Sequence, residues 1–388
     1  MFDENGELLI IAHYTKEELR QMKGRKFYCL RCQEEIILKV GERKRAHFAH
    51  YPSIKSKKIG HGESVHHIFA KTLLYEHFTR LGKEVKLEFF LKSINQQPDL
   101  LIKNSRAGDI AFEFQASNLS LTRFRERTLA LQRNGFIPIW ILSNKLLNMK
   151  GENIIKVTDS LLQFMHQTST MKHPQLYFFN PDKKLIIVLE HIFILSSKRA
   201  YVQKRLIPLN KMSSVDFFYE NVFQVRRFIN IWRKTKKHDR LRVRKKAYGA
   251  EADYRTWLYE KGFHFDTLPA VINLPTVSSF MFKIPPINWQ SRIYLQVIDP
   301  LPINSHFTYD DCLTSISPYL KKLHDYPLII GKLSPINSYL KLLINLKIIV
   351  QSNKTTYKKI KASPQMVNIE KALIADDDII NELLYNLR

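Results

Sequence analysis

The segment DIAFEFQAS, residues 109–117, places a carboxylate and an amide within an otherwise apolar strand pattern. Successive side chains of a strand point to opposite faces, so Phe112 and Phe114 share one face. Glu113 and Gln115 then share the other face. Because burying an unpaired carboxylate costs several kcal/mol unless it is paired or binds a metal, this strand predicts a sheet that carries a polar site on one face.

The pattern around this strand predicts an α/β fold. Helical spacing of apolar residues covers 63–82 and 120–135, with Gly82 and Gly135 as C-terminal stops. Strand patterns cover 85–91, 98–103, 109–117 and 136–142. The expected order is therefore helix, three strands, helix, strand, with helices covering the faces of the sheet.

Asp99 follows Pro98 at the start of the strand that precedes Glu113. If these two strands pair through the polar turn KNSRAGD, Asp99 and Glu113 approach each other on one face. Two such carboxylates repel unless a divalent cation lies between them. Oxygen ligands completed by substrate phosphate favour Mg²⁺ or Mn²⁺, which would activate water for phosphodiester cleavage. Gln115, on the same face, is the candidate to hold that water.

The stretch PDLLIKNSRAGDIAFEFQAS resembles the motif of the PD-(D/E)XK nuclease superfamily, with Gln115 where that superfamily most often has lysine. The wider chain is similar to the bacterial competence protein CoiA family. The similarity lies, over roughly residues 25–145, in FYCLRCQEEIILKVGERKRAHFAH, HHIFAKTLLYEHF, PDLLI, AFEFQAS, RFRERTLALQRNG and PIWIL. The resemblance implies a nuclease-like core of order α-β-β-β-α-β in a cytoplasmic protein that acts on incoming DNA during transformation.

Glutamine at position 115 can orient water but lacks the positive charge that a lysine would bring to the scissile phosphate. Glu63, His67 and Lys71 lie four residues apart on one helix face, so Lys71 is a candidate for that charge. The superfamily resemblance implies a further carboxylate ligand on this helix, and Glu63 is the best-placed residue. The alternative is a charged stripe that faces solvent.

The formal net charge of +25 arises from 61 Lys and Arg against 36 Asp and Glu, and it favours a polyanionic partner. DNA is the leading candidate and an anionic membrane surface the lesser one. The run RKTKKHDRLRVRKK, residues 233–246, is either a phosphate-contacting arm or a solvated helix face or linker. Arg123 and Arg127 contact substrate phosphate or lie on an exposed helix with Glu126. The expected DNA-binding residues are Arg123, Arg127, Arg233, Lys234, Lys236, Lys237, Arg240, Arg242, Arg244, Lys245 and Lys246.

A second metal site is predicted near the N-terminus. Cys29 and Cys32 form a Cys-x2-Cys pair, and His47 and His50 form a His-x2-His pair after 14 intervening residues. Two such pairs suit tetrahedral Zn²⁺, which would stabilise a subdomain too small to hold its own core. The alternative is a pair of buried cysteines with histidines packed nearby.

Four regions are expected along the chain: a zinc-ribbon-like subdomain (1–60), the nuclease-like domain (61–150), a hairpin and basic helical region (151–250) and a C-terminal domain (251–388). Within the last, residues 335–361 read as a helix followed by a hairpin, which is compatible with a winged-helix-like module. The longest apolar run, 185–195, is too short to span a bilayer. Three cysteines make no disulfide framework, so a reduced, cytoplasmic protein without stable membrane insertion is expected.

These features predict a Mg²⁺- or Mn²⁺-dependent nuclease with structural Zn²⁺, and the family resemblance implies that it acts on DNA in transformation and recombination. An accessory protein that binds incoming DNA without cutting it, as an aid to recombination, is the main alternative, and a membrane-surface or scaffold protein is a third. Recombination proteins are candidate partners. The sequence leaves the oligomeric state, the strandedness of the DNA and the mode of cleavage open.

Overall fold

A computed structural model describes residues 1–5, 9, 11, 14–29, 34–42, 46–51, 65–105, 108–242, 246–331, 334–362, 364 and 366–386. The chain forms two compact units. The first comprises Met1–Leu146, Tyr177–Ile187 and Leu206–Phe217, and the second Leu147–Leu176, Val188–Arg205 and Phe218–Arg388. Strands β11 (Leu185–Ser196) and β12 (Arg199–Pro208) each run from one unit into the other, so the units interleave along the chain.

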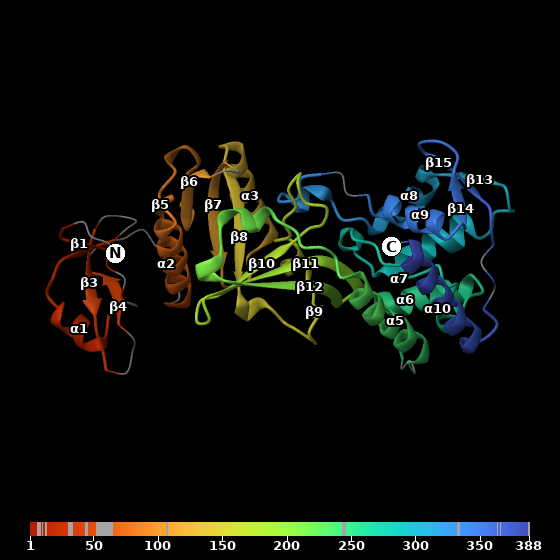
Figure 1. The fold of residues 1–388 in the computed structure, drawn as a ribbon, viewed down its shortest axis with the longest axis horizontal. Helices are drawn as coiled ribbons and strands as arrows, with labels where there is room; N and C mark the ends of the chain where they lie inside the picture. Colours follow the sequence, from red (N-terminus) through yellow and green to blue (C-terminus); the bar gives the residue numbers. More distant parts are fainter. Residues whose placement is uncertain are drawn as a thin grey trace. The chain divides into compact units, whose positions relative to one another are not determined.

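The first unit begins with a small antiparallel sheet and one helix, drawn in red in Figure 1. The strand order is β1 (Phe2–Asp3), β2 (Phe27–Tyr28), β3 (Glu35–Lys39) and β4 (His47–His50). Helix α1 (Lys16–Gln21) starts at a capping box in which the Glu18 N–H donates to Thr15 Oγ1 and the Thr15 N–H donates to Glu18 Oε2. Its buried Leu19 joins a core with Phe27 and Ile36.

The main sheet of the first unit contains, in strand order, β5 (Glu84–Leu87), β6 (Leu100–Ser105), β7 (Gly108–Gln115), β8 (Ile137–Ser143) and β10 (Leu176–Asn180). The pairs β5–β6 and β6–β7 are antiparallel, whereas β7–β8 and β8–β10 are parallel. Helix α2 (Val65–Arg80) precedes β5, and helix α3 (Leu121–Arg133) connects β7 to β8. The elements therefore follow the predicted order of helix, three strands, helix and strand.

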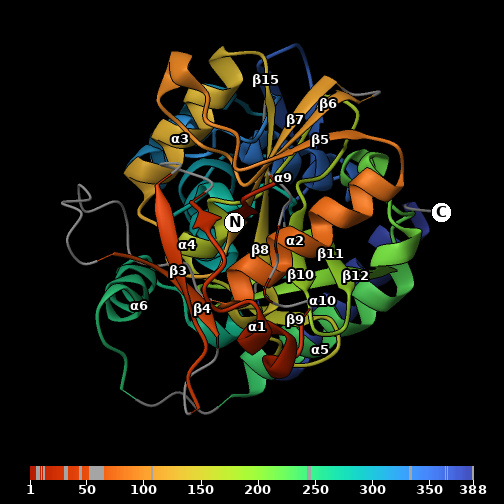
Figure 2. The ribbon, with the colours of Figure 1, turned by 90° about the vertical axis from the view of Figure 1, so that its left-hand side faces the viewer.

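Alternating side chains of β7 pack against helices α2 and α3. The ribbons of these three elements are labelled in Figure 2. The Phe112 ring stacks on Phe78 of α2 with centroids 5.4 Å apart. The neighbouring Ala111 packs instead with Leu131 of α3 and with Leu101 of β6. Because neighbouring residues of a strand face opposite ways, α2 and α3 cover opposite faces of this sheet. Glu113 and Gln115 have the same parity as Ala111 and belong to the α3 face.

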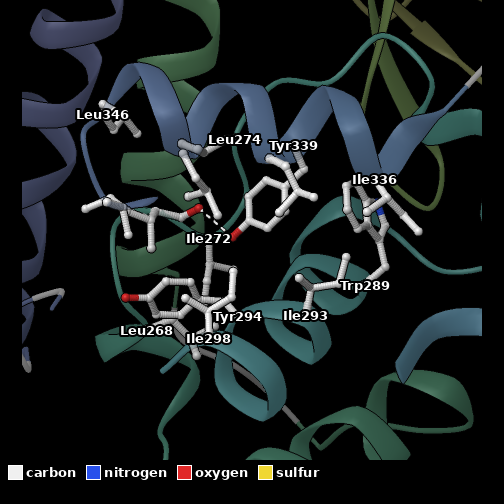
Figure 3. Close-up of a cluster of buried hydrophobic side chains, with 14 of the residues drawn as sticks. Leu268, Ile272, Leu274, Trp289, Ile293, Tyr294, Ile298, Ile336, Tyr339 and Leu346 are labelled. Atoms are coloured by element: carbon white, nitrogen blue, oxygen red, sulfur yellow. Dashed lines mark hydrogen bonds between the residues drawn. The ribbon is translucent and has the colours of Figure 1, made fainter. Parts of the chain in front are cut away.

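The second unit is mostly helical. Its helices are α4 (Asp159–Leu162), α5 (Val225–Leu241), α6 (Ala250–Glu260), α7 (Pro286–Ile293), α8 (Tyr309–Ile316), α9 (Pro335–Asn345) and α10 (Ile369–Asn386). Its further strands are β9 (Ile154–Lys156), which pairs with β12, and the antiparallel set β13 (His306–Thr308), β15 (Thr356–Lys359) and β14 (Ile349–Gln351). Figure 3 shows part of its core, where the Trp289 and Tyr339 rings meet edge to face and Tyr339 donates to the Val271 carbonyl.

Part of the basic run 233–246 lies inside this unit. Lys236 and Arg240 are 4% and 7% exposed, and both bind Asp376 of α10. This corrects the expectation that these two residues contact DNA, because their charges are already paired and sealed from solvent. Arg233 is half-buried and pairs with Asp377. Four Lys and Arg residues of the run are exposed, namely Lys234, Lys237, Arg242 and Lys246, whereas Arg244 and Lys245 lie outside the described residues.

The helix and hairpin expected at residues 335–361 are present as α9, β14 and β15, with the turn at residues 352–355. The winged-helix-like interpretation of this region stays a prediction. The hairpin expected within residues 151–250 is present as β10 and β11, which are neighbours in the sheet. Among the described residues, no helix combines the length and apolar character that a membrane span requires.

Candidate active site

Strand pairing brings Asp99 and Glu113 together. Leu100 lies opposite Phe112 in the antiparallel pair β6–β7, and extending this register by one residue places Asp99 opposite Glu113. The Phe114 backbone N–H donates to Asp99 Oδ2 at 2.7 Å, which fixes the Asp99 carboxylate at the point where β6 begins. The two carboxylates thus belong to adjacent strands at one end of the sheet, where Asp99 contacts residues of α2 and Glu113 contacts Arg127 of α3. Their joint role as metal ligands stays a prediction.

Asp99 is surrounded by donors from helix α2. His67 Nε2 lies 3.2 Å from Asp99 Oδ2, and Lys71 Nζ lies 3.6 Å from Oδ1. Although burial raises the pKa of the Asp99 carboxyl, the His67 hydrogen bond and the Lys71 charge outweigh it and hold the pKa below its usual value. Asp99 is therefore a buried carboxylate that stays ionised, as a metal ligand must be.

Lys71 also donates to a third acid, Glu88. Glu88 directly follows β5, where its backbone adopts the left-handed region with φ of 48° and its N–H donates to the Asp99 carbonyl at 3.0 Å. This turn brings the ends of β5 and β6 together, so the Glu88 and Asp99 side chains share one ammonium group. The Lys71 side chain is 3% exposed, so its charge is directed at these two carboxylates and away from bulk water.

Glu113 is held by Arg127 of helix α3. Arg127 Nη2 donates to both oxygens of Glu113 at 2.6 Å, and Glu113 is 3% exposed. Burial raises the pKa of the Glu113 carboxyl to about 7, an effect that the nearby Asp99 charge reinforces and Arg127 only partly offsets. Glu113 is consequently poised between its protonated and ionised forms near neutral pH.

We call this group the Asp99 cluster: Asp99, Glu113, Glu88, His67, Lys71 and Arg127. It contains three carboxyl groups and two permanent cations, with a histidine that can add a third charge. These six residues can therefore accept a further cation. Their carboxylate oxygens are the hard ligands that Mg²⁺ or Mn²⁺ prefers.

The structure also describes two other predicted site residues, Gln115 and Arg123. Gln115 Nε2 donates to the Ser117 carbonyl at 2.6 Å, so its amide is tied to the segment after β7. Arg123 is exposed in the first turn of α3, whose N-cap Ser120 accepts from the Arg123 N–H. Glu63 lies outside the described residues.

Sequence reasoning missed Glu88 and the pairing of Arg127 with Glu113. The signal for Glu88 was an acid at the end of an apolar strand, in KLEFF, but its approach to Asp99 depends on a left-handed turn that the sequence does not announce. Arg127 lies fourteen positions after Glu113, and that spacing alone gives no indication of contact.

The expected zinc ligands are partly described. Cys29 is buried at the end of β2, whereas Cys32 lies outside the described residues. His47 and His50 are three positions apart in β4, so regular strand alternation directs them to opposite faces. His50 shares the parity of Phe48, which packs against Phe27. The zinc site stays a prediction.

Comparison with known proteins agrees with this architecture. Family models match residues 11–57 as "Competence protein CoiA, N-terminal domain", 63–222 as "Competence protein CoiA, nuclease-like domain" and 230–373 as "Competence protein CoiA, C-terminal domain". The chain is 25% identical over 286 residues to "Competence protein CoiA" of Bacillus subtilis (strain 168), covering 73% of this chain and 75% of that protein. No solved structure matches. Because three consecutive domain models match in order along the sequence, the chain belongs to the competence protein CoiA family.

Proposed function

We propose that this competence-related protein is a Mg²⁺- or Mn²⁺-dependent deoxyribonuclease that processes incoming DNA in the cytoplasm. The observation that carries the proposal is the placement of Asp99 opposite Glu113 on adjacent strands, with Lys71 Nζ 3.6 Å from Asp99. The nuclease-like family match over residues 63–222 supports it, because this region contains the whole Asp99 cluster.

The donor set fits a hard divalent cation. Asp99 and Glu113 would supply its carboxylate ligands, because the strand register places them opposite each other on β6 and β7. A bound Mg²⁺ or Mn²⁺ supplies Lewis-acid chemistry: it lowers the pKa of a water ligand and stabilises charge on the phosphodiester. His67 and the Phe114 N–H would keep the Asp99 carboxylate oriented.

Lys71 would take the place of the lysine that is missing at position 115. Its ammonium group already lies beside Asp99, and it comes from helix α2, not from the strand of the motif. A buried cation near the scissile phosphate stabilises the charge that develops in the transition state. Gln115 would then position the segment that follows β7 through its bond to Ser117 and would not contribute charge.

Arg127 would occupy the Glu113 carboxylate until a metal binds. Its guanidinium supplies the positive charge beside Glu113 when no metal does, so metal binding requires this pair to open or to share the carboxylate. The same pair favours a second candidate function, an accessory protein that binds DNA without cutting it and assists recombination proteins. In that case Arg127 would hold Glu113 permanently and the cluster would be structural.

A cleavage panel separates the two functions. Full-length protein is incubated with single-stranded, duplex and branched DNA, with Mg²⁺, Mn²⁺ or chelator, beside Asp99→Asn, Glu113→Gln and a control, Glu84→Gln, which changes an exposed acid of β5. The nuclease proposal expects metal-dependent cleavage that falls by at least about 1,000-fold in the two site variants, while DNA binding and the control are unchanged. Binding without cleavage of any DNA in either metal would establish the accessory function instead.

A further inference from the structure

Two histidines and a glutamate converge in the second unit, outside the Asp99 cluster. His173 lies just before Gln175, His191 lies in strand β11, and Glu220 precedes helix α5. One potential ligand atom from each residue lies within 4.8 Å of the others. Three separate chain segments thus bring together the side-chain types that bind borderline transition metals.

His191 is held with one ring nitrogen unused. Its Nε2 donates to the Asn221 carbonyl at 2.8 Å, and because a carbonyl only accepts, this bond places the proton of the neutral ring on Nε2. The buried Nδ1 forms no hydrogen bond with any described residue, and it lies 3.4 Å from Glu220 Oε1. A ring lone pair then faces a carboxylate oxygen, an arrangement that a cation between the two atoms would stabilise.

The backbone at His191 is also unusual. Its φ is 49°, in the left-handed region, within a buried strand. A non-glycine residue pays of order 1–3 kcal/mol for such a conformation, which persists only when the surroundings impose it, and it is enriched at functional sites. The imidazole of this residue lies beside Glu220 and packs on Phe223, with ring centroids 4.7 Å apart.

Glu220 is oriented by the backbone of the segment that carries His173. The N–H groups of Lys172 and His173 donate to Glu220 Oε2 at 2.9 and 3.4 Å. The other oxygen, Oε1, contacts His173 Nδ1 and faces His191. One carboxylate oxygen is thereby occupied, and the other is left to the two imidazoles.

The neighbours of Glu220 are fixed as well. The Tyr219 carbonyl accepts from Gln175 Nε2 at 2.9 Å and from Arg205 Nη2 at 3.1 Å. The Asn221 N–H donates to Glu190 Oε2 at 3.2 Å. Such hydrogen bonds behind the ligands are characteristic of metal sites, where they set the ring tautomer and the direction of the carboxylate.

We propose that His173, His191 and Glu220 form a binding site for Zn²⁺ or a similar first-row divalent cation. The two-histidine, one-carboxylate set is one that zinc uses with a water molecule as fourth ligand. The His173 and Glu220 side chains are 23% and 13% exposed, so the open coordination position would face solvent. The site is independent of the proposed nuclease chemistry, because neither Asp99 nor Glu113 contributes to it.

The competing arrangement is metal-free: His173 donates a proton to Glu220, and His191 is a packed neutral ring. The metal must replace that proton, and each ligand is then required. The distinction is measurable with Co²⁺, whose visible spectrum reports coordination and shows an additional charge-transfer band when thiolates bind. This band separates the site from the predicted cysteine-containing one.

The test titrates metal-free full-length protein with Co²⁺ and then Zn²⁺, with Mg²⁺ in excess to occupy hard oxygen sites. We expect one Co²⁺ ion per protein molecule (one equivalent) to bind without a thiolate band. This equivalent should still bind to the Cys29→Ser variant and should be displaced by Zn²⁺. Its affinity should fall by at least about 100-fold in His173→Gln and Glu220→Gln, and not in His324→Gln, an exposed control. Absence of this equivalent from the Cys29→Ser protein would overturn the proposal, and so would its retention at full affinity in both ligand variants.

Discussion

Two buried clusters of charge, one in each unit, are built on opposite principles. In the Asp376 cluster, defined as Lys236, Arg240 and Asp376, two cations share one carboxylate. Each cation also donates to backbone carbonyls: Lys236 to Ala270 and Ile272, and Arg240 to Asp266 and Leu268. In the Asp99 cluster, three carboxyl groups face two permanent cations, and Lys71 is divided between Glu88 and Asp99.

The difference appears in how the acids titrate. Burial acts to raise the pKa of the Asp376 carboxyl, but Lys236 and Arg240 more than compensate and hold it below its usual value. Burial raises the pKa of Glu113 to about 7, because one guanidinium does not offset burial and a neighbouring acid. In the Asp376 cluster the cations are satisfied by one carboxylate and by backbone carbonyls. The named residues of the Asp99 cluster instead have more acids than permanent cations, so they can bind a further cation.

The largest effect is expected from Asp376→Ala. This change leaves Lys236 and Arg240 buried without their acid, so the free energy of unfolding of the second unit should fall by about 3–5 kcal/mol. Urea-induced unfolding measures it. The neighbouring Asp377→Ala, which removes an acid that is 59% exposed, is the matched control and should change stability by less than about 1 kcal/mol. Equal effects from the two variants would mean that the Asp376 cluster is not structural.

Lys71→Met should act on activity more than on stability. The methionine fills a similar volume, and Asp99 keeps its bonds to His67 and the Phe114 N–H. Metal-dependent cleavage should fall by about 100-fold or more, because a preorganised charge is lost from the transition state. The control is Lys86→Met, since the Lys86 side chain is 41% exposed and pairs with the nearby Glu84. Undiminished cleavage by Lys71→Met would remove Lys71 from the catalytic role.

Glu113 should make stability depend on pH in the direction opposite to Asp376. Its pKa of about 7 in the folded protein exceeds the usual 4.5, so the folded state holds the proton more tightly. Stability should therefore be greatest below pH 4.5 for this group and fall as the pH rises to 7, by on the order of 3 kcal/mol at most. Unfolding of wild type and Glu113→Gln at pH 5 and pH 8 measures the difference.

Mg²⁺ provides a second test of the pH dependence at Glu113. Because a divalent cation binds the ionised carboxylate, Mg²⁺ affinity should rise with pH through about 7. Mg²⁺ should then restore stability to wild type at pH 8 and have no such effect on Glu113→Gln. If the stability of the wild type changes neither with pH nor with Mg²⁺ in this range, Glu113 is permanently ionised and paired with Arg127.

The fold of the nuclease-like region could be predicted because its signals are local. The period of apolar residues defined α2 and α3, and the short polar segment between the two strand patterns indicated that β6 and β7 pair in antiparallel fashion. The partners of the charged residues could not be predicted, because they depend on helix rotation and distant contacts. Arg240 meets an acid 136 positions away, and no spacing pattern indicates that it is buried.

Helix α5 has basic residues that are buried in the core of the second unit and others that are exposed and could contact DNA. Lys236 is buried, whereas Lys234 and Lys237 are exposed. If the exposed pair contacts phosphates, Lys234→Gln with Lys237→Gln should lower DNA affinity and reduce the slope of log K against log salt by about 2. Binding measured at several salt concentrations tests this, with Lys261→Gln plus Lys322→Gln as exposed controls in the same unit. An unchanged slope would assign α5 to stability alone.

The smallest effect is expected from Gln115→Ala. Its amide donates to Ser117, so removing it loosens the segment after β7 without changing the charge of the Asp99 cluster. Cleavage should fall by less than about tenfold, since a lost neutral hydrogen bond is worth roughly 0.5–1.5 kcal/mol. Gln115→Lys would add a charge beside one that Lys71 already supplies, so it should not exceed wild type in rate. If Gln115→Lys instead restores cleavage to the Lys71→Met protein, a lysine at either position can supply the positive charge. The acids of the Asp99 cluster then need one cation for cleavage, whichever element provides it.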